Sequence, residues 1–340
     1  MRKPPFLRPG LPVGLAAPSF GCATEPYKSL FESALQRFNH MGLPTIEGPN
    51  CRLSRGVGIS NAPEECAAEL MELMLSPMTQ GVLSVAGGEL MCEILPYLDF
   101  AALATAPPKW FMGYSDNTNF GFLYATLCET MSVYGPCAQS YGARELHPSL
   151  TDAMDLLCGR KNTFYGYGRW QRESLQTPDN PLEPYNLTEK TRYRIFNGDK
   201  DSALLTGRFL GGCGDILVNL AGTKYDNVGS FAGGDQKGIV WFIEFCDLDP
   251  MSMRRTLWSL REAGWFDSAN GFIIGRPLHF DDEVLGVDRF GALEPILSLD
   301  VPVVADFDLG HLPPMMPFVN GAEGQLRCTA DRAELRYFDL

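Results

Sequence analysis

The stretch KWFMGYSDNTNFGFLYATLCETMSVY, residues 109–134, decides the fold class. Its apolar start, residues 109–114, predicts a buried strand, residues 117–129 predict a helix, and residues 131–134 predict a second strand. A strand, a helix and a strand in this order form one βαβ unit of a parallel sheet. The turn GYSDNT, residues 113–118, therefore follows the carboxyl end of a buried strand, where α/β proteins place their sites.

The same alternation continues towards the N-terminus. Residues 11–17 and 81–85 read as strands, and residues 27–41 as a helix. A further helix is expected after Asn61, with Glu64 completing a capping box. These elements predict a doubly wound α/β domain.

The chain is expected to divide into three parts. Residues 1–150 form the N-terminal domain, and residues 151–202 lose periodicity and read as an irregular linker or substrate loop. Residues 203–340 form a second α/β domain, which a hairpin over residues 324–338 closes. Its other strands and helices are expected at residues 203–210, 214–221, 238–245, 250–264, 271–274 and 302–306.

The composition excludes several classes of protein. With 340 residues, 45% hydrophobic and 20% charged, the chain can fill a sizeable core and is not disordered. Its 28 basic and 41 acidic side chains give a net charge of −13, which argues against nucleic acid or an anionic membrane as a partner. No run approaches the ~20 apolar residues of a membrane span. Pro and Gly interrupt the apolar start of the chain, which argues against a signal peptide.

The ten cysteines include no CxxC pair, so neither a zinc knuckle nor a disulfide scaffold is predicted. Reduced thiols in a cytoplasmic protein are the simpler interpretation.

A nucleophile is expected at Ser115. A serine at a sharp turn from strand to helix has its hydroxyl lifted off the sheet, and the helix N-terminus supplies N–H groups for developing negative charge. The alternative is an ordinary helix cap by Ser115 or Asp116. The usual GxSxG pattern is absent, because residue 117 is Asn.

A serine nucleophile needs a base, and the chain has four histidines. His40 and His147 are expected in solvent. His311 follows a buried strand through residues 308–310, and His279, which also follows a strand, is its competitor.

The orienting acid is expected at Glu244, inside the apolar run IVWFIEFC of residues 239–246. A lone carboxylate there would be costly, and a histidine partner would satisfy it. The order is then Ser115, Glu244, His311. Alternatively, Glu244 marks the strand's end and meets solvent or an arginine. Asp247 and Asp249 are expected to cap the helix that starts at residue 250.

Two further groups of residues invite an interpretation. Backbone N–H groups of Gly87 or Gly88, with that of Asp116, would make an oxyanion hole, although a tight glycine turn is the simpler alternative. Asp306, Asp308 and His311 are candidates for a metal site, but no second cluster completes a coordination shell.

In combination, GLAAPS, AGGELMCEILPYLDF, PKWFMGYSDNT, GRFLGGCGDILVNLAGTKYD, IVWFIEFCD and DFDLGHLPPMMPFVNG resemble the LD-carboxypeptidase family of serine peptidases. The resemblance runs in order from about residue 11 to residue 321. It implies a flavodoxin-like N-terminal domain that carries the nucleophile, a swivelling C-terminal α/β domain that carries the acid and the base, and a homodimer. It assigns the nucleophile to Ser115, the acid to Glu244 and the base to His311. Oxyanion donation is assigned to the backbone of Asp116 and of Gly87-Gly88.

The family includes murein tetrapeptide carboxypeptidases of peptidoglycan recycling and microcin C immunity hydrolases, which confer microcin resistance. Where the murein enzymes tend to show RGGYG, this chain has AGGEL, which favours the immunity branch and hydrolysis of a peptidyl or aminoacyl-nucleotide amide. Glu89 and Trp170 are then expected to contact substrate. Trp170 is expected to stack on a nucleobase, with Tyr165, Tyr167 and Tyr185 as substitutes. No metal and no organic cofactor is expected. Murein tetrapeptide cleavage is the alternative, followed by a non-catalytic small-ligand binding protein and by an unrelated α/β-hydrolase esterase.

Overall fold

The structure is a computed structural model that describes residues 1–199, 201–233 and 237–340. The chain folds into two compact units, neither of which is continuous in sequence. Unit 1 comprises Met1–Lys161 and Glu173–Asn186, and unit 2 comprises Asn162–Arg172 and Leu187–Leu340.

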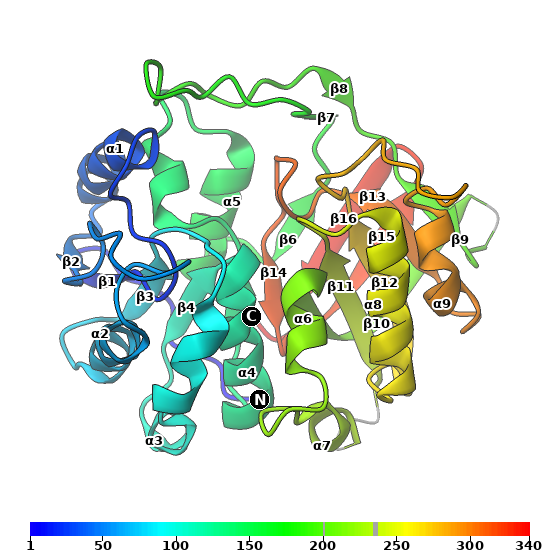
Figure 1. The fold of residues 1–340 in the computed structure, drawn as a ribbon, viewed down its shortest axis with the longest axis horizontal. Helices are drawn as coiled ribbons and strands as arrows, with labels where there is room; N and C mark the ends of the chain where they lie inside the picture. Colours follow the sequence, from blue (N-terminus) through cyan, green and yellow to red (C-terminus); the bar gives the residue numbers. More distant parts are fainter. Residues whose placement is uncertain (200, 234–236) are drawn as a thin grey trace. The chain divides into compact units, whose positions relative to one another are not determined.

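Unit 1 contains a parallel sheet flanked by helices, as expected for a doubly wound domain (Figure 1). Its strands follow the order β5-β4-β3-β1-β2, so that β4 lies between β3 and β5. The strands are β1 (Val13–Ala16), β2 (Thr45–Glu47), β3 (Gly81–Ser84), β4 (Trp110–Gly113) and β5 (Ser132–Tyr134). The α-helices are α1 (Tyr27–His40), α2 (Pro63–Leu75), α3 (Phe100–Thr105), α4 (Thr118–Cys128) and α5 (Pro148–Leu157). The 3-10 helices are η1 (Met91–Tyr97), η2 (Ser115–Asn117) and η3 (Ala138–Gly142).

Burial explains why these segments adopt their structures. In α1, the buried residues Leu30, Phe31, Ala34 and Phe38 recur at helical spacing and form one stripe. Every residue of β1, β3, β4 and β5 is buried, as parallel strands covered on both faces require. Helix α4 is buried on all sides, so its sequence shows no amphipathic stripe.

Unit 2 is built on a mixed sheet with the order β6-β16-β15-β10-β11-β12-β13-β9, in which β10 to β13 are parallel. Helices α6 and α8 lie over one face of this sheet (Figure 1). Its strands are β6 (Thr163–Tyr165), β7 (Arg169–Trp170), β8 (Glu189–Lys190), β9 (Arg194–Phe196), β10 (Ser202–Cys213), β11 (Ile239–Glu244), β12 (Ala269–Gly275), β13 (Val303–Phe307), β14 (Phe318–Asn320), β15 (Glu323–Thr329) and β16 (Arg332–Tyr337). Its helices are α6 (Gly214–Leu220), α7 (Val228–Gly233), α8 (Pro250–Glu262), η4 (Gly291–Leu293) and α9 (Glu294–Leu297).

The expected α/β class is confirmed, and two local expectations are wrong. The capping box at Asn61 and Glu64 does not form: α2 starts after Ala62 without a side-chain cap, and the Asn61 amide donates to Asn50 instead. The helix begins at Pro63, which presets its first turn, so Ala62 and not Asn61 occupies the N-cap position. Of the two aspartates expected to cap α8, only Asp249 does so, accepting from the Ser252 N–H at 2.7 Å.

The residues between 151 and 202 are more ordered than their sequence suggests. They contain the second half of α5 and the short strands β6, β7, β8 and β9. Within the described residues, no helix combines the length and the apolar character that crossing a bilayer demands.

A buried carboxylate fastens the carboxyl end of β1. Glu69 of α2 is 3% exposed, and its two oxygens accept hydrogen bonds from the backbone N–H groups of Ala17 and Asn50. Burial raises the pKa of Glu69 to about 7. The two N–H groups favour the ionised carboxylate and reduce this rise. The folded protein therefore holds a proton on Glu69 that the unfolded chain releases at lower pH.

The pKa of Glu69, raised to about 7, predicts a pH dependence of stability. Its contribution is fully present below about pH 4.5 and is lost as the pH rises through 7. We expect the free energy of unfolding of the wild type, relative to Glu69→Gln, to fall by about 2–3 kcal/mol across this window. Urea unfolding of both proteins at several pH values measures the difference. A difference that stays constant with pH would contradict the assignment.

Candidate active site

The turn at Ser115 in unit 1 has the geometry expected of a strained elbow. Ser115 follows β4 after one residue and has a φ of 61°, a left-handed value that a non-glycine residue rarely adopts. Its backbone N–H donates to the Tyr134 hydroxyl at 3.0 Å. The Asn117 side chain donates to the carbonyls of Ala86 and Tyr114, which fixes the turn against the end of β3. The N-cap residue of α4 is Asn117, and its side chain does not cap the helix.

The Asp116 carboxylate connects three loops that follow β1, β3 and β4. It is 1% exposed and accepts hydrogen bonds from the Ser19 hydroxyl, the Met91 N–H at 2.9 Å and the Asn119 amide at 2.9 Å. Burial raises its pKa to about 6, Glu89 adds to the rise, and the hydrogen bonds oppose it. From the sequence, Asp116 was expected to supply a backbone N–H or to cap a helix, and Ser19 was assigned no role.

The glycine pair lies against this turn. A Cβ placed on Gly87 would lie 3.1 Å from Cβ and 3.3 Å from Oγ of Ser115, so the backbone of residue 87 approaches the hydroxyl closely. A Cβ on Gly88 would collide with Oγ of Ser19. Position 88 therefore needs glycine, a side chain at position 87 would be tightly packed against Ser115, and the proposed oxyanion donors lie within the same unit as Ser115.

Unit 2 brings together the expected acid and base. Glu244 ends β11, is 0% exposed, and its Oε2 lies 2.8 Å from Nδ1 of His311. Burial of a carboxylate in an apolar strand end requires such a partner, as the sequence predicted. The alternative in which this carboxylate meets solvent is wrong, because Glu244 is 0% exposed.

Gly310 makes this contact possible. Its φ is +98°, and a Cβ on it would lie 2.5 Å from Oε2 and 2.8 Å from Cβ of Glu244. Only glycine accommodates both the left-handed backbone and the closeness of the acid. The turn after β13 therefore carries His311 back over Glu244.

The charge on His311 is set by competing effects. Burial lowers the pKa of its ring, but the Glu244 carboxylate and a hydrogen bond with the Cys246 thiol outweigh it and hold the pKa well above 6.5. The half-buried Cys246 was not singled out from the sequence. The Asp215 carboxylate accepts from the N–H groups of Cys246 and Asp247, which fixes the turn after Glu244.

The metal hypothesis has no support in the contacts of its aspartates. Asp306 accepts two hydrogen bonds from Arg289, and Asp308 forms a buried ion pair with Arg276 at 2.7 Å. Within residues 1–199, 201–233 and 237–340, no three His, Cys, Asp or Glu side chains converge as metal ligands would.

The other candidates lie as follows. His279 pairs with Asp282 at the surface, His40 is exposed, and His147 caps α5 by accepting from the Ser149 N–H.

The two expected substrate contacts differ in exposure. Glu89 is exposed in the loop after Gly88. Trp170 is 4% exposed, because its ring packs 5.0 Å from that of Phe280 and 5.2 Å from the Arg276 guanidinium. In this conformation the indole offers little surface on which a nucleobase could stack.

Comparison with known proteins gives the family. Residues 13–135 match the model of the LD-carboxypeptidase N-terminal domain, and residues 206–326 match that of its C-terminal domain. The Escherichia coli microcin C7 self-immunity protein MccF is 27% identical over 276 residues, covering 78% of this chain and 76% of that protein. A probable murein peptide carboxypeptidase of Bacillus subtilis is 26% identical over 340 residues, covering 97% and 92%.

Solved structures share the fold along the whole chain. An MccF-like protein from Bacillus anthracis superposes with a TM-score of 0.82 at 20% identity, covering 99% of this chain and 100% of that one. MccF in complex with aspartyl sulfamoyl adenosine gives 0.80 at 22% identity, covering 99% of each. Because both domain models match, in order and over most of the sequence, this chain belongs to the LD-carboxypeptidase family of hydrolases.

Proposed function

We propose that the protein hydrolyses an amide bond through a serine nucleophile, with Ser115, Glu244 and His311 as the catalytic triad. The observation that carries the proposal is the buried contact of 2.8 Å between Glu244 and Nδ1 of His311. An acid that holds one ring nitrogen leaves the other to take the proton of a nucleophile. The strained turn at Ser115 supplies a hydroxyl at the end of a strand, as such a mechanism needs.

In the proposed reaction, His311 takes the Ser115 proton as the serine oxygen attacks the substrate carbonyl. The backbone N–H groups of Asp116 and of Gly87-Gly88 stabilise the tetrahedral oxyanion. His311 then protonates the leaving amine, and water activated by the same imidazole hydrolyses the acyl-enzyme. The closeness of Gly87 to Ser115 supports this assignment of the donors.

We propose an aminoacyl-nucleotide or peptidyl-nucleotide amide as the substrate. Two findings support this choice: one relative is named a microcin C7 self-immunity protein, and solved structures of that protein hold aspartyl sulfamoyl adenosine and glutamyl sulfamoyl guanosine. Glu89, exposed beside the oxyanion glycines, is proposed to contact the substrate. Trp170 can contribute only if its packing on Phe280 opens. A murein tetrapeptide is the second candidate, because a relative named as a murein peptide carboxypeptidase matches 97% of the chain.

We further propose a cytoplasmic homodimer. Free thiols at all ten cysteines suit a reducing compartment, and the homodimer rests on the family resemblance.

The substrate proposal predicts the outcome of a paired assay. We expect the wild type to cleave an aspartyl-sulfamoyl adenosine amide, and Ser115→Ala to lose at least about 10³-fold in kcat/KM with unchanged thermal stability. Product identification by mass spectrometry, with an L,D-linked murein tetrapeptide run in parallel, separates the two substrates. Release of D-alanine alone would favour the murein alternative. Inertness towards both would favour a binding protein, and retained activity in Ser115→Ala would exclude this nucleophile.

The raised pKa of His311 predicts the pH profile. A general base must be neutral, so kcat/KM should rise with pH and reach half its maximum above pH 6.5. Glu244→Gln removes the carboxylate that stabilises the imidazolium and should move this midpoint to lower pH. NMR titration of the His311 ring in both proteins measures the same shift without a substrate. An unchanged ring pKa would contradict the pairing.

Gly88 predicts a steric effect on folding. Gly88→Ala should destabilise the protein by about 1–3 kcal/mol, because the new methyl group collides with Oγ of Ser19. Ser19→Gly removes that oxygen, so the double variant should be less destabilised than the sum of the single variants. Urea unfolding of the four proteins completes this cycle. Strict additivity would show that the collision is absent.

A further inference from the structure

Helix α8 presents a surface that the proposed reaction does not use. We call the residues Met251, Arg254, Arg255, Trp258 and Arg261 the α8 surface. They recur every three or four residues and therefore share one side of the helix. The buried residues of α8, which pack into unit 2, lie on its other side: they are Pro250, Met253, Thr256, Leu257 and Leu260.

Trp258 forms a ridge on this surface. It is 53% exposed, whereas the other four tryptophans are 4% exposed or less. A hollow of about 450 Å³ lies on its α9 side, where Glu294, Pro295 and Ser298 complete the lining. A second hollow, of about 400 Å³, lies on its α6 side, at Val218. Trp258 and Arg255 line both hollows, so the indole separates them.

The surface is locally basic on an acidic chain. Arg254 donates to the Gly291 carbonyl and Arg255 to the Ser252 hydroxyl. In the described part of the chain, neither guanidinium has a carboxylate within ion-pair distance; Arg261 alone of the three pairs, with Glu262. One acid, Glu294, faces three arginines in the larger hollow, whereas the whole chain carries a net charge of −13.

We propose that the α8 surface binds an acidic polypeptide segment that places an apolar side chain on either side of Trp258. Arginine, tryptophan and methionine are enriched at the energetic centres of protein interfaces. A ridge between two shallow hollows is complementary to another polypeptide, whereas a small molecule would need an enclosing pocket. Carboxylates on the partner would pair with Arg254 and Arg255, the two arginines of this surface that form no ion pair of their own among the described residues. The inference does not depend on the proposed reaction.

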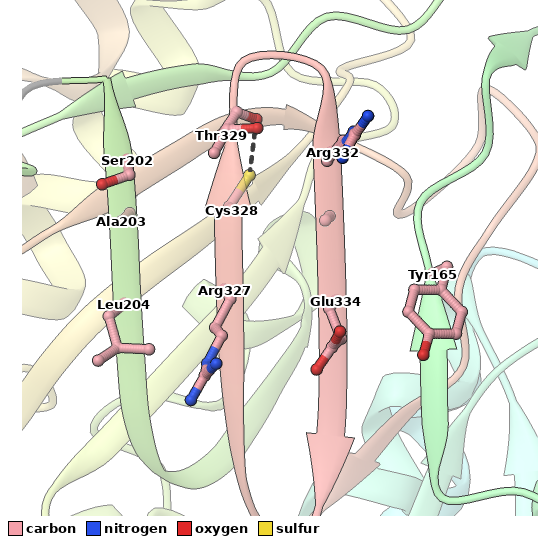
Figure 2. Close-up of a pocket in the computed structure, with 10 residues that line it drawn as sticks. Tyr165, Ser202, Ala203, Leu204, Arg327, Cys328, Thr329, Arg332 and Glu334 are labelled. Atoms are coloured by element: carbon pink, nitrogen blue, oxygen red, sulfur yellow. Dashed lines mark hydrogen bonds between the residues drawn. The ribbon is translucent and has the colours of Figure 1, made fainter.

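Another hollow on unit 2 provides the comparison. It measures about 560 Å³ and lies over β10, β15, β16 and β6 (Figure 2). Arg327 lies directly across from Glu334 on the neighbouring strand, in the pattern of a sheet face that meets water. This hollow has two arginines, Arg327 and Arg332, but no exposed tryptophan ridge. It therefore serves as a control surface, on which two arginines can be replaced with the same change in net charge.

The exposure of Trp258 makes the test selective, since acrylamide quenches mainly exposed indoles. The probe is a short synthetic peptide of glutamate and leucine residues with blocked ends, and its glutamine counterpart is the control peptide. We expect the acidic peptide to protect the tryptophan emission saturably and Trp258→Phe to abolish the protected signal. Arg254→Glu with Arg255→Glu should weaken binding at least tenfold. Arg327→Glu with Arg332→Glu changes the net charge equally and should leave binding unchanged.

Three results would overturn the proposal. One is the lack of saturable protection up to about 1 mM peptide. Another is equal weakening in the two double-arginine variants, which would indicate attraction by overall charge. The third is concentration-dependent self-association that Arg254→Glu with Arg255→Glu abolishes, because a second copy of this chain would then be the occupant. Equal thermal midpoints of all variants show that folding is unaffected.

Discussion

A carboxylate at the end of a fully buried strand is the constraint on which unit 2 depends. Glu244 has no water to solvate it, so its charge must be met by a group that the fold itself brings close. The turn after β13 does this, and it needs glycine at position 310 because the acid occupies the space that a side chain would take. The His311 ring is thereby oriented by packing and by charge together. The proposed catalytic contact is therefore also the contact that the buried carboxylate needs.

Unit 1 also contains a buried carboxylate, that of Asp116, but its partners are of a different kind. Asp116 is as deeply buried as Glu244, yet it is surrounded by neutral hydrogen-bond donors from Ser19, Met91 and Asn119. Without a cation, its pKa rises to about 6 because burial dominates. Burying this carboxylate is unfavourable, but its hydrogen bonds hold together the segments that follow three neighbouring strands. The turn at Ser115 can remain strained only where its surroundings determine it so strongly.

Much of the fold could be predicted from the sequence, because buried positions recur at the period of the helix or strand and are occupied by apolar residues. The helix expected at residues 27–41 is α1, and the apolar run before Cys246 is β11. Glu244 and His311 could be paired because an acid inside an apolar run needs a partner and few histidines follow strands. The prediction of a capping box was wrong because α2 begins at Pro63, so that Ala62 and not Asn61 is the N-cap residue. The roles of Ser19 and Cys246 arise from contacts between distant segments, and no local pattern encodes such contacts.

The division of the chain has a consequence for dissecting or recombining this protein. The backbone passes between the units three times, after residues 161, 172 and 186. A fragment that ends at residue 161 would lack Leu182, whose carbonyl accepts from the Arg144 N–H. A fragment that starts at residue 187 would lack β6, which pairs with β16 and carries the buried Phe164. No single cut of the chain yields two fragments that each contain one complete unit. Truncation and domain exchange must therefore keep both units together.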